Sequence, residues 1–365
     1  MRRIVIKNIG PLQDVDIELA RVNVIIGPQS SGKSCVLKIA CYCTWVEKKI
    51  QLAQSAEDFM RDGFFVQELT RFHKLKGYFR KDSYIGYESD FMKFSYDACV
   101  SRFSFEWKDG RWEYRRPKVS YIPAERNMVA AIPNWFDVKL YDDNIQSFMA
   151  DWDTARKAYT EQLDILNLGV SYHYDETANK DRVEVDDDTT LELTNTSSGL
   201  QSLIPLFLHL NYIGKDMFGR NEAQSYANLQ LGRQFMKTLQ TKLFNGLTTL
   251  ETEARSHEIY NRFFKSAYSE IFLEEPENNL FPPTQARLVD WLLRLTEGER
   301  ASNMFVATHS PYMMTAFLER ELKDFKLFFE KKEGKRSTVV TATDADVQEI
   351  YDDGIDVFYN IESYT

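Results

Sequence analysis

Residues 27–34, with the sequence GPQSSGKS, have the spacing G-x-x-x-x-G-K-[ST] of a phosphate-binding loop. Gly27 and Gly32 allow the backbone to curl until successive N–H groups face one anion. Lys33 can then reach the β- and γ-phosphates of a nucleotide, and the Ser34 hydroxyl can ligate Mg²⁺. The alternative is a glycine-rich turn with a surface lysine. The residues of this segment predicted to bind ATP are Gly27, Pro28, Gln29, Ser30, Ser31, Gly32, Lys33, Ser34 and Cys35.

A second group of polar residues lies in IFLEEPENNLF, residues 271–281, where an apolar run ends in two adjacent glutamates. Burying two carboxylates is costly unless a cation or a proton transfer requires them. Transfer of a phosphoryl group to water needs Mg²⁺ near the β- and γ-phosphates and a residue that orients the water. Because adjacent residues of a strand point to opposite sides, we assign Glu274 to Mg²⁺ and Glu275 to the water. The alternative is a solvated acidic loop after a strand.

His309 follows another apolar run, in the sequence VATHSP. An imidazole at that place can donate a hydrogen bond to a γ-phosphate oxygen and respond to its loss. We therefore predict that His309 is catalytic together with Glu275. The alternative is a histidine whose hydrogen bonds are satisfied inside the protein or at its surface.

These residues must be positioned by the strands and helices around them. The runs VNVIIG, EIFLEEP and NMFVATHS are predicted as buried strands, and a long helix is predicted from about Ser31. A further helix is expected from about Gly199 to Tyr212, and the KDGR segment of residues 108–111 is expected to close a hairpin. Strand–helix alternation at both ends of the chain, around a different middle, predicts an α/β fold with an insertion.

We interpret the 365 residues as a single domain made of several parts. Residues 1–63 and 117–126 are expected to form the N-terminal part of a nucleotide-binding lobe. Residues 64–116 are expected to be an inserted hairpin region, and residues 127–267 a helical lobe. Residues 268–365 would complete the nucleotide-binding lobe with the acidic pair and the histidine.

The composition, with 43% apolar and 27% charged residues, is typical of a soluble globular protein. The net charge of -10 excludes a surface that is basic all over, so any nucleic-acid binding would need a local patch. No run reaches membrane-spanning length and the N-terminus is too polar for a signal peptide, so we expect a cytoplasmic protein with no membrane partner. Four cysteines without CxxC or zinc spacing are expected to be reduced.

Two segments, residues 71–81 and 111–118, interleave arginine and lysine with aromatic residues. Such segments could bind a nucleic-acid backbone and stack on bases. They could equally be strands with alternating exposed charges. The acidic net charge favours the second interpretation, and DNA binding through a local basic patch remains open.

The order of these motifs resembles the ABC-type ATPase heads of the SMC and RecF branch. The resemblance is carried by GPQSSGKS, YIPAER, TSSGLQS, FLEEPE and ATHSP. Within that branch the chain is most similar to the OLD (overcoming lysogenization defect) family and to related ATPases of bacterial anti-phage defence. It implies an α/β P-loop NTPase fold, an ABC-ATPase head with a mixed sheet, flanking helices and an inserted hairpin and helical region. The stretch after His309 is too short for the Toprim nuclease of full OLD proteins, so we expect none in this chain.

In that family two heads pack head to tail, and ATP lies between the phosphate loop of one and the signature helix of the other. The resemblance therefore implies that Ser197, Ser198 and Gly199 bind ATP across a homodimer interface, where a helix start attracts an anion. An ordinary helix cap is the alternative. Leu200 departs from the family pattern, in which a second glycine stands at that place.

The function implied by the resemblance is Mg²⁺-dependent hydrolysis of ATP by a homodimer or higher oligomer, coupled to a separate effector protein or to DNA in phage defence. One alternative is the nucleotide-binding subunit of a transporter, whose usual compact middle the aromatic, hairpin-rich segment does not resemble. Another alternative is a scaffold that binds ATP tightly and barely turns it over.

Overall fold

The computed structural model describes residues 2–139, 141–219, 226–247, 249–320, 322 and 324–353. Within these ranges eleven strands form one mixed sheet. In spatial order they are β6 (Arg102–Trp107), β5 (Met92–Asp97), β4 (Phe79–Glu88), β1 (Arg2–Ile9), β2 (Leu12–Leu19), β15 (Arg336–Thr341), β14 (Phe325–Glu333), β3 (Val22–Ile26), β13 (Asn303–Ala307), β12 (Tyr268–Glu274) and β7 (Pro117–Ile122).

One half of this sheet is parallel and deeply buried. It consists of β14, β3, β13, β12 and β7, each parallel to its neighbours in that order. All five residues of β3 are buried, which is typical of parallel strands covered on both faces. The strands predicted from VNVIIG, EIFLEEP and NMFVATHS are therefore confirmed as β3, β12 and β13.

The other half is antiparallel and consists of β6, β5, β4, β1 and β2. Its strands bury one face and expose the other, as the alternation of buried and exposed residues along β5 shows. The last hairpin joins the two halves, because β15 pairs antiparallel with β14 and parallel with β2. The chain thus uses its C-terminal strands to connect its first strands to the parallel half.

Helix α1 (Lys33–Ala53) packs against one face of the sheet and shares a hydrophobic core with β1, β2 and β4. The opposite face is covered by α5 (Asn144–Arg156), α6 (Ser198–Gly214), α9 (Pro282–Arg294) and α10 (Pro311–Leu318), which share a second core. Alternation along β3 divides its side chains between the two cores: Ile25 packs on the α1 side, and Val24 and Ile26 pack on the other.

Shorter elements complete the part of the chain that the structure describes. The remaining α-helices are α2 (Glu57–Met60), α3 (Phe64–Phe72), α4 (Met128–Ala131), α7 (Tyr226–Lys242), α8 (Leu250–Phe264) and α11 (Asp344–Asp353). The 3-10 helices are η1 (Asp109–Glu113), η2 (Ala124–Asn127), η3 (Trp135–Asp137), η4 (Leu193–Asn195) and η5 (Asp216–Gly219). A small antiparallel sheet contains β8 (Leu163–Asp164), β9 (Ser171–Asp175), β10 (Lys180–Asp186) and β11 (Thr189–Glu192).

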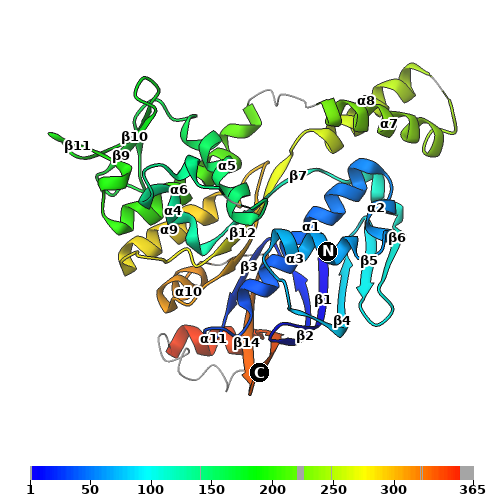
Figure 1. The fold of residues 1–365 in the computed structure, drawn as a ribbon, viewed down its shortest axis with the longest axis horizontal. Helices are drawn as coiled ribbons and strands as arrows, with labels where there is room; N and C mark the ends of the chain where they lie inside the picture. The colour runs from blue at the N-terminus through cyan, green and yellow to red at the C-terminus, as the bar shows by residue number, and fades with distance from the viewer. Residues whose placement is uncertain are drawn as a thin grey trace.

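The small sheet and the α7–α8 pair lie at opposite ends of the molecule (Figure 1). Helices α7 and α8 have a core of their own, in which Phe235 and Phe263 pack against Tyr114 and Leu52. Leu52 belongs to α1, so this core attaches the pair to the helix that follows the phosphate loop.

Two local expectations in the middle of the chain need correction. Residues 108–111 do not close a hairpin, because β6 is followed by the 3-10 helix η1 and then by β7. Residues 64–72 form helix α3 rather than part of a hairpin. The apolar residues of α3 recur at helical spacing, and Phe65 and Leu69 face the core of α1. The hairpins of this region are formed by β4, β5 and β6, which extend the large sheet.

The mixed sheet with helices on both faces confirms the predicted α/β fold class. The helix predicted from Gly199 to Tyr212 is also confirmed, as α6, and β14 and β15 form a hairpin near the end of the described residues. All four cysteines are free thiols. Among the described residues, no helix is both long and apolar enough to cross a bilayer.

Candidate functional site

The predicted site residues gather at one edge of the parallel half of the sheet. Ile25 of β3 is level with Ala307 of β13, and Ala307 is level with Glu274 of β12. The segments that follow these three strands therefore leave the sheet side by side at its carboxyl edge, where open α/β sheets bind ligands. They are the phosphate loop, the acidic pair and the segment that contains His309.

The backbone of the phosphate loop requires both of its glycines. A Cβ at Gly27 would lie 2.7 Å from Glu330 Cβ, and a Cβ at Gly32 would lie 2.7 Å from Leu12 Cδ2. Gly32 also has φ 129°, which side-chain-bearing residues rarely adopt, and it is the residue from which α1 begins. The loop is thus held between β2, β14 and the start of α1, whose N–H groups point toward the site.

Lys33 closes the loop from inside. Its Nζ donates hydrogen bonds to Gly27 O at 2.8 Å and to Pro28 O at 2.6 Å. An ammonium group has three donors, so one N–H remains for an anion. Burial lowers the pKa of Lys33 to about 8, while the carboxylates of Glu330, Glu275 and Glu277 act in the opposite direction. A bound polyphosphate would favour the charged form further.

The other loop residues divide by exposure. Gln29 and Ser30 are exposed, Pro28 and Ser34 are partly buried, and Ser31 is buried. Cys35 packs its side chain into the α1 core, and burial raises its pKa to about 12. Contact between Cys35 and a nucleotide would therefore have to use its backbone N–H, not its thiol.

Glu330, on β14, is a buried acid at this site that we did not anticipate from the sequence. Its Oε2 accepts a hydrogen bond from the Ser31 hydroxyl at 2.5 Å, and its side chain is fully buried beneath the loop. Burial raises the pKa of Glu330 to about 7, although Ser31 and Lys33 oppose the rise. An acid directly after the apolar run LFF of β14 was the only local sign of this contact.

Glu274 ends β12 with a carboxylate that is 4% exposed. Its Oε2 accepts a long hydrogen bond of 3.4 Å from Ala124 N. Its Oε1 and the neighbouring Tyr121 hydroxyl are both buried, and neither has a partner at ordinary hydrogen-bond geometry among the described residues, although the Tyr121 hydroxyl interacts with the Glu274 carboxylate. Burial and the Glu274 charge together raise the pKa of Tyr121. A buried carboxylate oxygen without a partner fits a cation, and Mg²⁺ typically takes one or two protein carboxylates besides phosphate oxygens.

Glu275 and His309 face each other across the strand ends. His309 Nε2 lies 3.5 Å from Glu275 Oε1, and the side chains are 30% and 35% exposed, respectively. The contact with His309 lowers the pKa of the Glu275 carboxyl, and Lys33 contributes in the same direction. Glu275 has φ 42°, so the backbone turns sharply at the residue predicted to orient water.

Glu277, the third acid of EEPE, bonds the backbone of His309. Its Oε1 accepts a hydrogen bond from His309 N at 2.6 Å. Burial raises the pKa of Glu277, although this backbone hydrogen bond opposes the rise. The spacing of the three glutamates was visible in the sequence, but the contact between Glu277 and the segment that contains His309 was not.

The three predicted signature residues lie at the start of α6, not in the phosphate loop of their own chain. Ser197 caps the helix by accepting a hydrogen bond from Leu200 N at 3.4 Å, and Ser197 and Ser198 are exposed. A Cβ at Gly199 would lie 3.1 Å from Asn279 O, in the loop after the acidic pair. Both the cap and the exposed helix start that a partner's nucleotide would require are therefore present.

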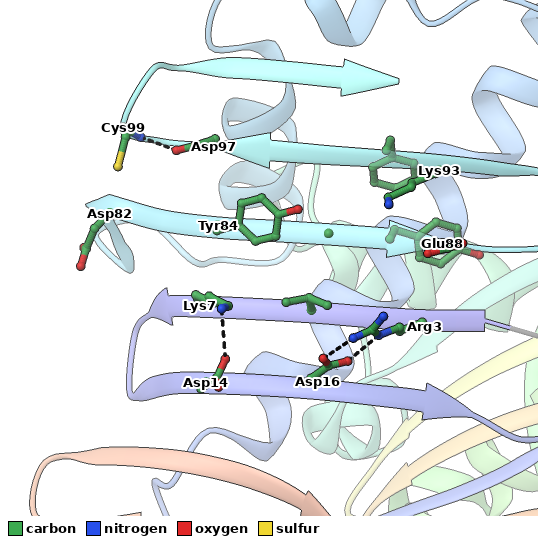
Figure 2. A pocket seen from close by; sticks show the side chains of 14 residues that line it. Arg3, Lys7, Asp14, Asp16, Asp82, Tyr84, Glu88, Lys93, Asp97 and Cys99 are labelled. Carbon is green, nitrogen blue, oxygen red and sulfur yellow. Dashed lines mark hydrogen bonds and ion pairs between the residues drawn. The ribbon is translucent and has the colours of Figure 1, made fainter. Parts of the chain in front are cut away.

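A hollow of about 560 Å³ lies on the outer face of β2, β1, β4 and β5. Two pairs of oppositely charged side chains contact each other in it (Figure 2). Arg3 donates to Asp16 at 2.7 and 2.5 Å, and Lys7 lies 3.9 Å from Asp14. The hollow is a solvated face of a twisted sheet.

Three basic residues of the two basic segments are paired with acids. Arg71 pairs with Glu68 and Asp142, Lys74 with Asp143, and Lys118 with Asp151. Arg111 lies over the rings of Trp107 and Trp112 at 5.0 and 4.5 Å. These contacts favour the structural interpretation of the segments over a nucleic-acid patch.

Comparison with known proteins gives a family for this arrangement. The sequence profile of a family described as "AAA domain" matches residues 3–280, most of the chain. The chain belongs to the AAA domain family. An AAA domain is an ATPase-type domain, and the strand–loop–helix geometry of residues 22–53 is that of a P-loop NTPase. No curated protein matches the sequence.

Solved structures that the AAA domain resembles include heads of SMC proteins. One is an SMC head bound to the C-terminal winged-helix domain of ScpA, with 12% identity, TM-score 0.49, and coverage of 95% of this chain and 99% of that chain. Another is the SMC head domain from Thermotoga maritima, with 12% identity, TM-score 0.44, and coverage of 93% and 98%. A third, from Pyrococcus furiosus, is an Smc head with an extended coiled coil bound to the C-terminal domain of ScpA, with 10% identity, TM-score 0.45, and coverage of 97% and 99%.

Proposed function

We propose that this AAA domain binds ATP with Mg²⁺ at the carboxyl edge of β3, β13 and β12 and hydrolyses it. The observation that carries the proposal is the convergence of incompletely bonded polar groups at this edge. Lys33 keeps one donor for an anion, and among the described residues Glu274 Oε1 is buried without a partner at ordinary hydrogen-bond geometry. Burial of a charged group with incomplete hydrogen bonding is costly, and it is typical of sites where a ligand of opposite charge completes the interactions.

Each residue has a distinct task in this reaction. Lys33 and the N–H groups at the start of α1 would bind and orient the phosphates. Ser34 and Glu274 would hold Mg²⁺, which when bound neutralises the charge that develops on the phosphates. Glu275 is ionised at neutral pH, and it would orient the attacking water and accept its proton. His309 would donate a hydrogen bond to the γ-phosphate.

We further propose that two copies are needed to complete the site. The start of α6 is exposed at Ser197 and Ser198, and its N–H groups suit a phosphate supplied by a second copy. A head-to-tail homodimer, or a higher oligomer built from it, would enclose ATP between the phosphate loop of one subunit and Gly199 of the other. The dimer would then close around ATP and open after hydrolysis, and this conformational change would be passed to a partner.

We propose that the partner that responds to this closure and opening is a separate effector protein in anti-phage defence. The proposal rests on the motif resemblance to OLD-type ATPases. DNA is the second candidate partner. Reversing the charges of Lys74, Lys76, Arg80 and Lys81 tests it across a salt series. Unchanged retention of DNA by the variant removes the basic segments from consideration, whereas loss of retention with a shallower salt dependence supports a DNA interface.

The dimer is tested by sedimentation of the purified chain with and without ATP and Mg²⁺. We expect ATP to convert monomer to dimer, and Ser198→Arg to prevent the conversion while leaving ATP binding by each monomer intact. The matched control is Thr177→Arg, in the turn between β9 and β10, which should dimerise like the wild type. A monomer that hydrolyses ATP at full rate would contradict the shared site.

A further inference from the structure

Arg126 is a buried cation beside the acidic pair. It lies in η2, directly after β7 in the YIPAER segment, and its side chain is 0% exposed. Burial lowers the pKa of its guanidinium to about 10, against the influence of Glu277, Glu275 and Glu274, so it remains charged at neutral pH. A charge held in the interior requires a matching set of acceptors.

The acceptors are main-chain carbonyls of the segment that follows β12. Arg126 Nη1 donates to Glu274 O at 2.9 Å and, more weakly, to Pro123 O at 3.4 Å. Its Nη2 donates to Glu275 O at 2.9 Å and to Pro276 O at 3.1 Å. One planar fork therefore holds three consecutive carbonyls, an arrangement for which the fixed donor geometry of arginine is suited.

These carbonyls need a donor because the strand beside them has ended. The pairing of β7 with β12 stops at Ile122 and Leu273. On the other side the segment still has a strand neighbour, since Glu275 N donates to Ala307 O at 2.8 Å. Arg126 thus replaces the missing strand for the residues that immediately follow β12, where buried carbonyls would otherwise lose their hydrogen bonds.

The turn that these bonds hold is strained and separates the two acids. Glu275 has φ 42°, a left-handed conformation that is unfavourable for a residue with a side chain. As a result Glu274 stays buried next to Ala124 N, whereas Glu275 is partly exposed and faces His309. Release of the carbonyls would allow the turn to relax and would move both carboxylates.

We propose that Arg126 is a positioning residue of the hydrolytic centre, whose guanidinium fork fixes the turn that aims Glu274 at the metal and Glu275 at the water. The inference rests on the proposed function, since it assigns Arg126 a role in that reaction. Arg126 acts through the backbone and does not itself contact the phosphates. The phosphate loop, on β3 and α1, should bind ATP without it.

The test is Arg126→Lys, which keeps the positive charge but cannot form the same fork. We expect kcat for ATP hydrolysis to fall about 100-fold, because a displacement of about 1 Å in the catalytic groups has an effect of that size. The affinity for ATP, measured by titration with a fluorescent analogue, should change less than about threefold. Arg126→Gln keeps two donors on an uncharged amide. Its kcat should lie between those of the wild type and Arg126→Lys, or equal that of Arg126→Lys.

A double-mutant cycle separates positioning from a general loss of structure. In the Glu275→Gln background, Arg126→Lys should lower kcat by less than about tenfold more, because the group that it positions is already disabled. A structural defect would instead multiply the two losses. The matched control is Arg156→Lys in α5, where another buried arginine bonds Asp153 and Asp181 away from the sheet edge. It should turn over ATP like the wild type.

The possible outcomes are distinguishable. A wild-type chain that neither binds nor hydrolyses ATP overturns the proposed function, and the inference with it. Wild-type turnover in Arg126→Lys and Arg126→Gln overturns the inference alone. Losses that multiply in the cycle, or failure of both Arg126 variants to fold, assign Arg126 to the core and also overturn the inference.

Discussion

Two regions of the molecule collect carboxylates, and they treat them in opposite ways. At the carboxyl edge of the parallel strands Glu274 and Glu330 are buried and Glu277 is partly buried, and Oε1 of Glu274 has no partner at ordinary hydrogen-bond geometry among the described residues. In the hollow of Figure 2, Asp14 and Asp16 are exposed and lie beside Lys7 and Arg3. The charges of these four side chains in the hollow are compensated by one another.

We infer the ligand site from this incomplete pairing of buried charge, and not from the presence of a hollow. Exposed ion pairs contribute little free energy and leave nothing for a ligand to complete. Buried charges without full pairing are costly to maintain, and this cost is recovered when a ligand of opposite charge binds. Variants at matched positions in the two regions can test this contrast directly.

The largest effect is expected from Glu275→Gln. Removal of the group that accepts the proton of the attacking water should lower kcat by about 100- to 1,000-fold, while ATP binding persists. Phosphate release under saturating ATP and Mg²⁺ measures the change. Asp16→Asn, the matched amide variant in the hollow, should leave the rate unchanged. Turnover that is already negligible in the wild type, with assembly unaffected by Glu275→Gln, would instead identify a scaffold.

Lys33→Ala is expected to affect binding. Loss of the charged donor from the loop should weaken ATP affinity by about 10- to 100-fold, which corresponds to one charge-assisted hydrogen bond. Titration with a fluorescent ATP analogue measures this change. Lys93→Ala, which removes an exposed lysine from the hollow, should bind ATP like the wild type. Equal affinities for all three proteins would contradict the assignment of the loop.

His73 extends the comparison to a buried polar group away from the sheet edge. Its ring packs 5.2 Å from that of Tyr121, and burial lowers its pKa to about 3 from 6.5. At pH values between these two pKa values, His73 is protonated in the unfolded chain and neutral in the folded chain. Its contribution to the free energy of unfolding therefore falls as the pH is lowered.

Relative to that of the wild type, the unfolding free energy of His73→Phe should therefore increase by about 2–3 kcal/mol when the pH is lowered from 7 to 4.5. Urea denaturation at the two pH values measures the gain. The control is His257→Phe, at an exposed position of α8, which should show no comparable gain. A difference between His73→Phe and the wild type that does not vary with pH would contradict the prediction.

The smallest effect is expected from breaking the Arg3–Asp16 pair in the hollow. The two side chains are 49% and 45% exposed, so Arg3→Ala should hardly change the melting temperature and should leave ATP turnover unchanged. Thermal unfolding and phosphate release measure the two quantities. A clear loss of turnover would show that the hollow communicates with the nucleotide edge, and the contrast between the two regions would weaken.

The sequence alone was sufficient to predict the features that depend on near neighbours. The phosphate loop, the strands of the parallel half and helix α6 are encoded in local spacing, so the α/β class follows from it. Local spacing also placed Glu275 and His309 at the ends of neighbouring strands. The KDGR segment shows the limit of such patterns, because a turn motif specifies a change of direction and not the element that follows.

Only the tertiary structure decided how distant segments complete the site. Arg126 holds a carbonyl 148 positions away, and Ser31 donates to an acid 299 positions away. The sequence also does not reveal that the last hairpin bridges the two halves of the sheet. These contacts are set by the packing of strands against one another, which no local pattern encodes, and they determine which of the many acids in this chain are left to meet a ligand.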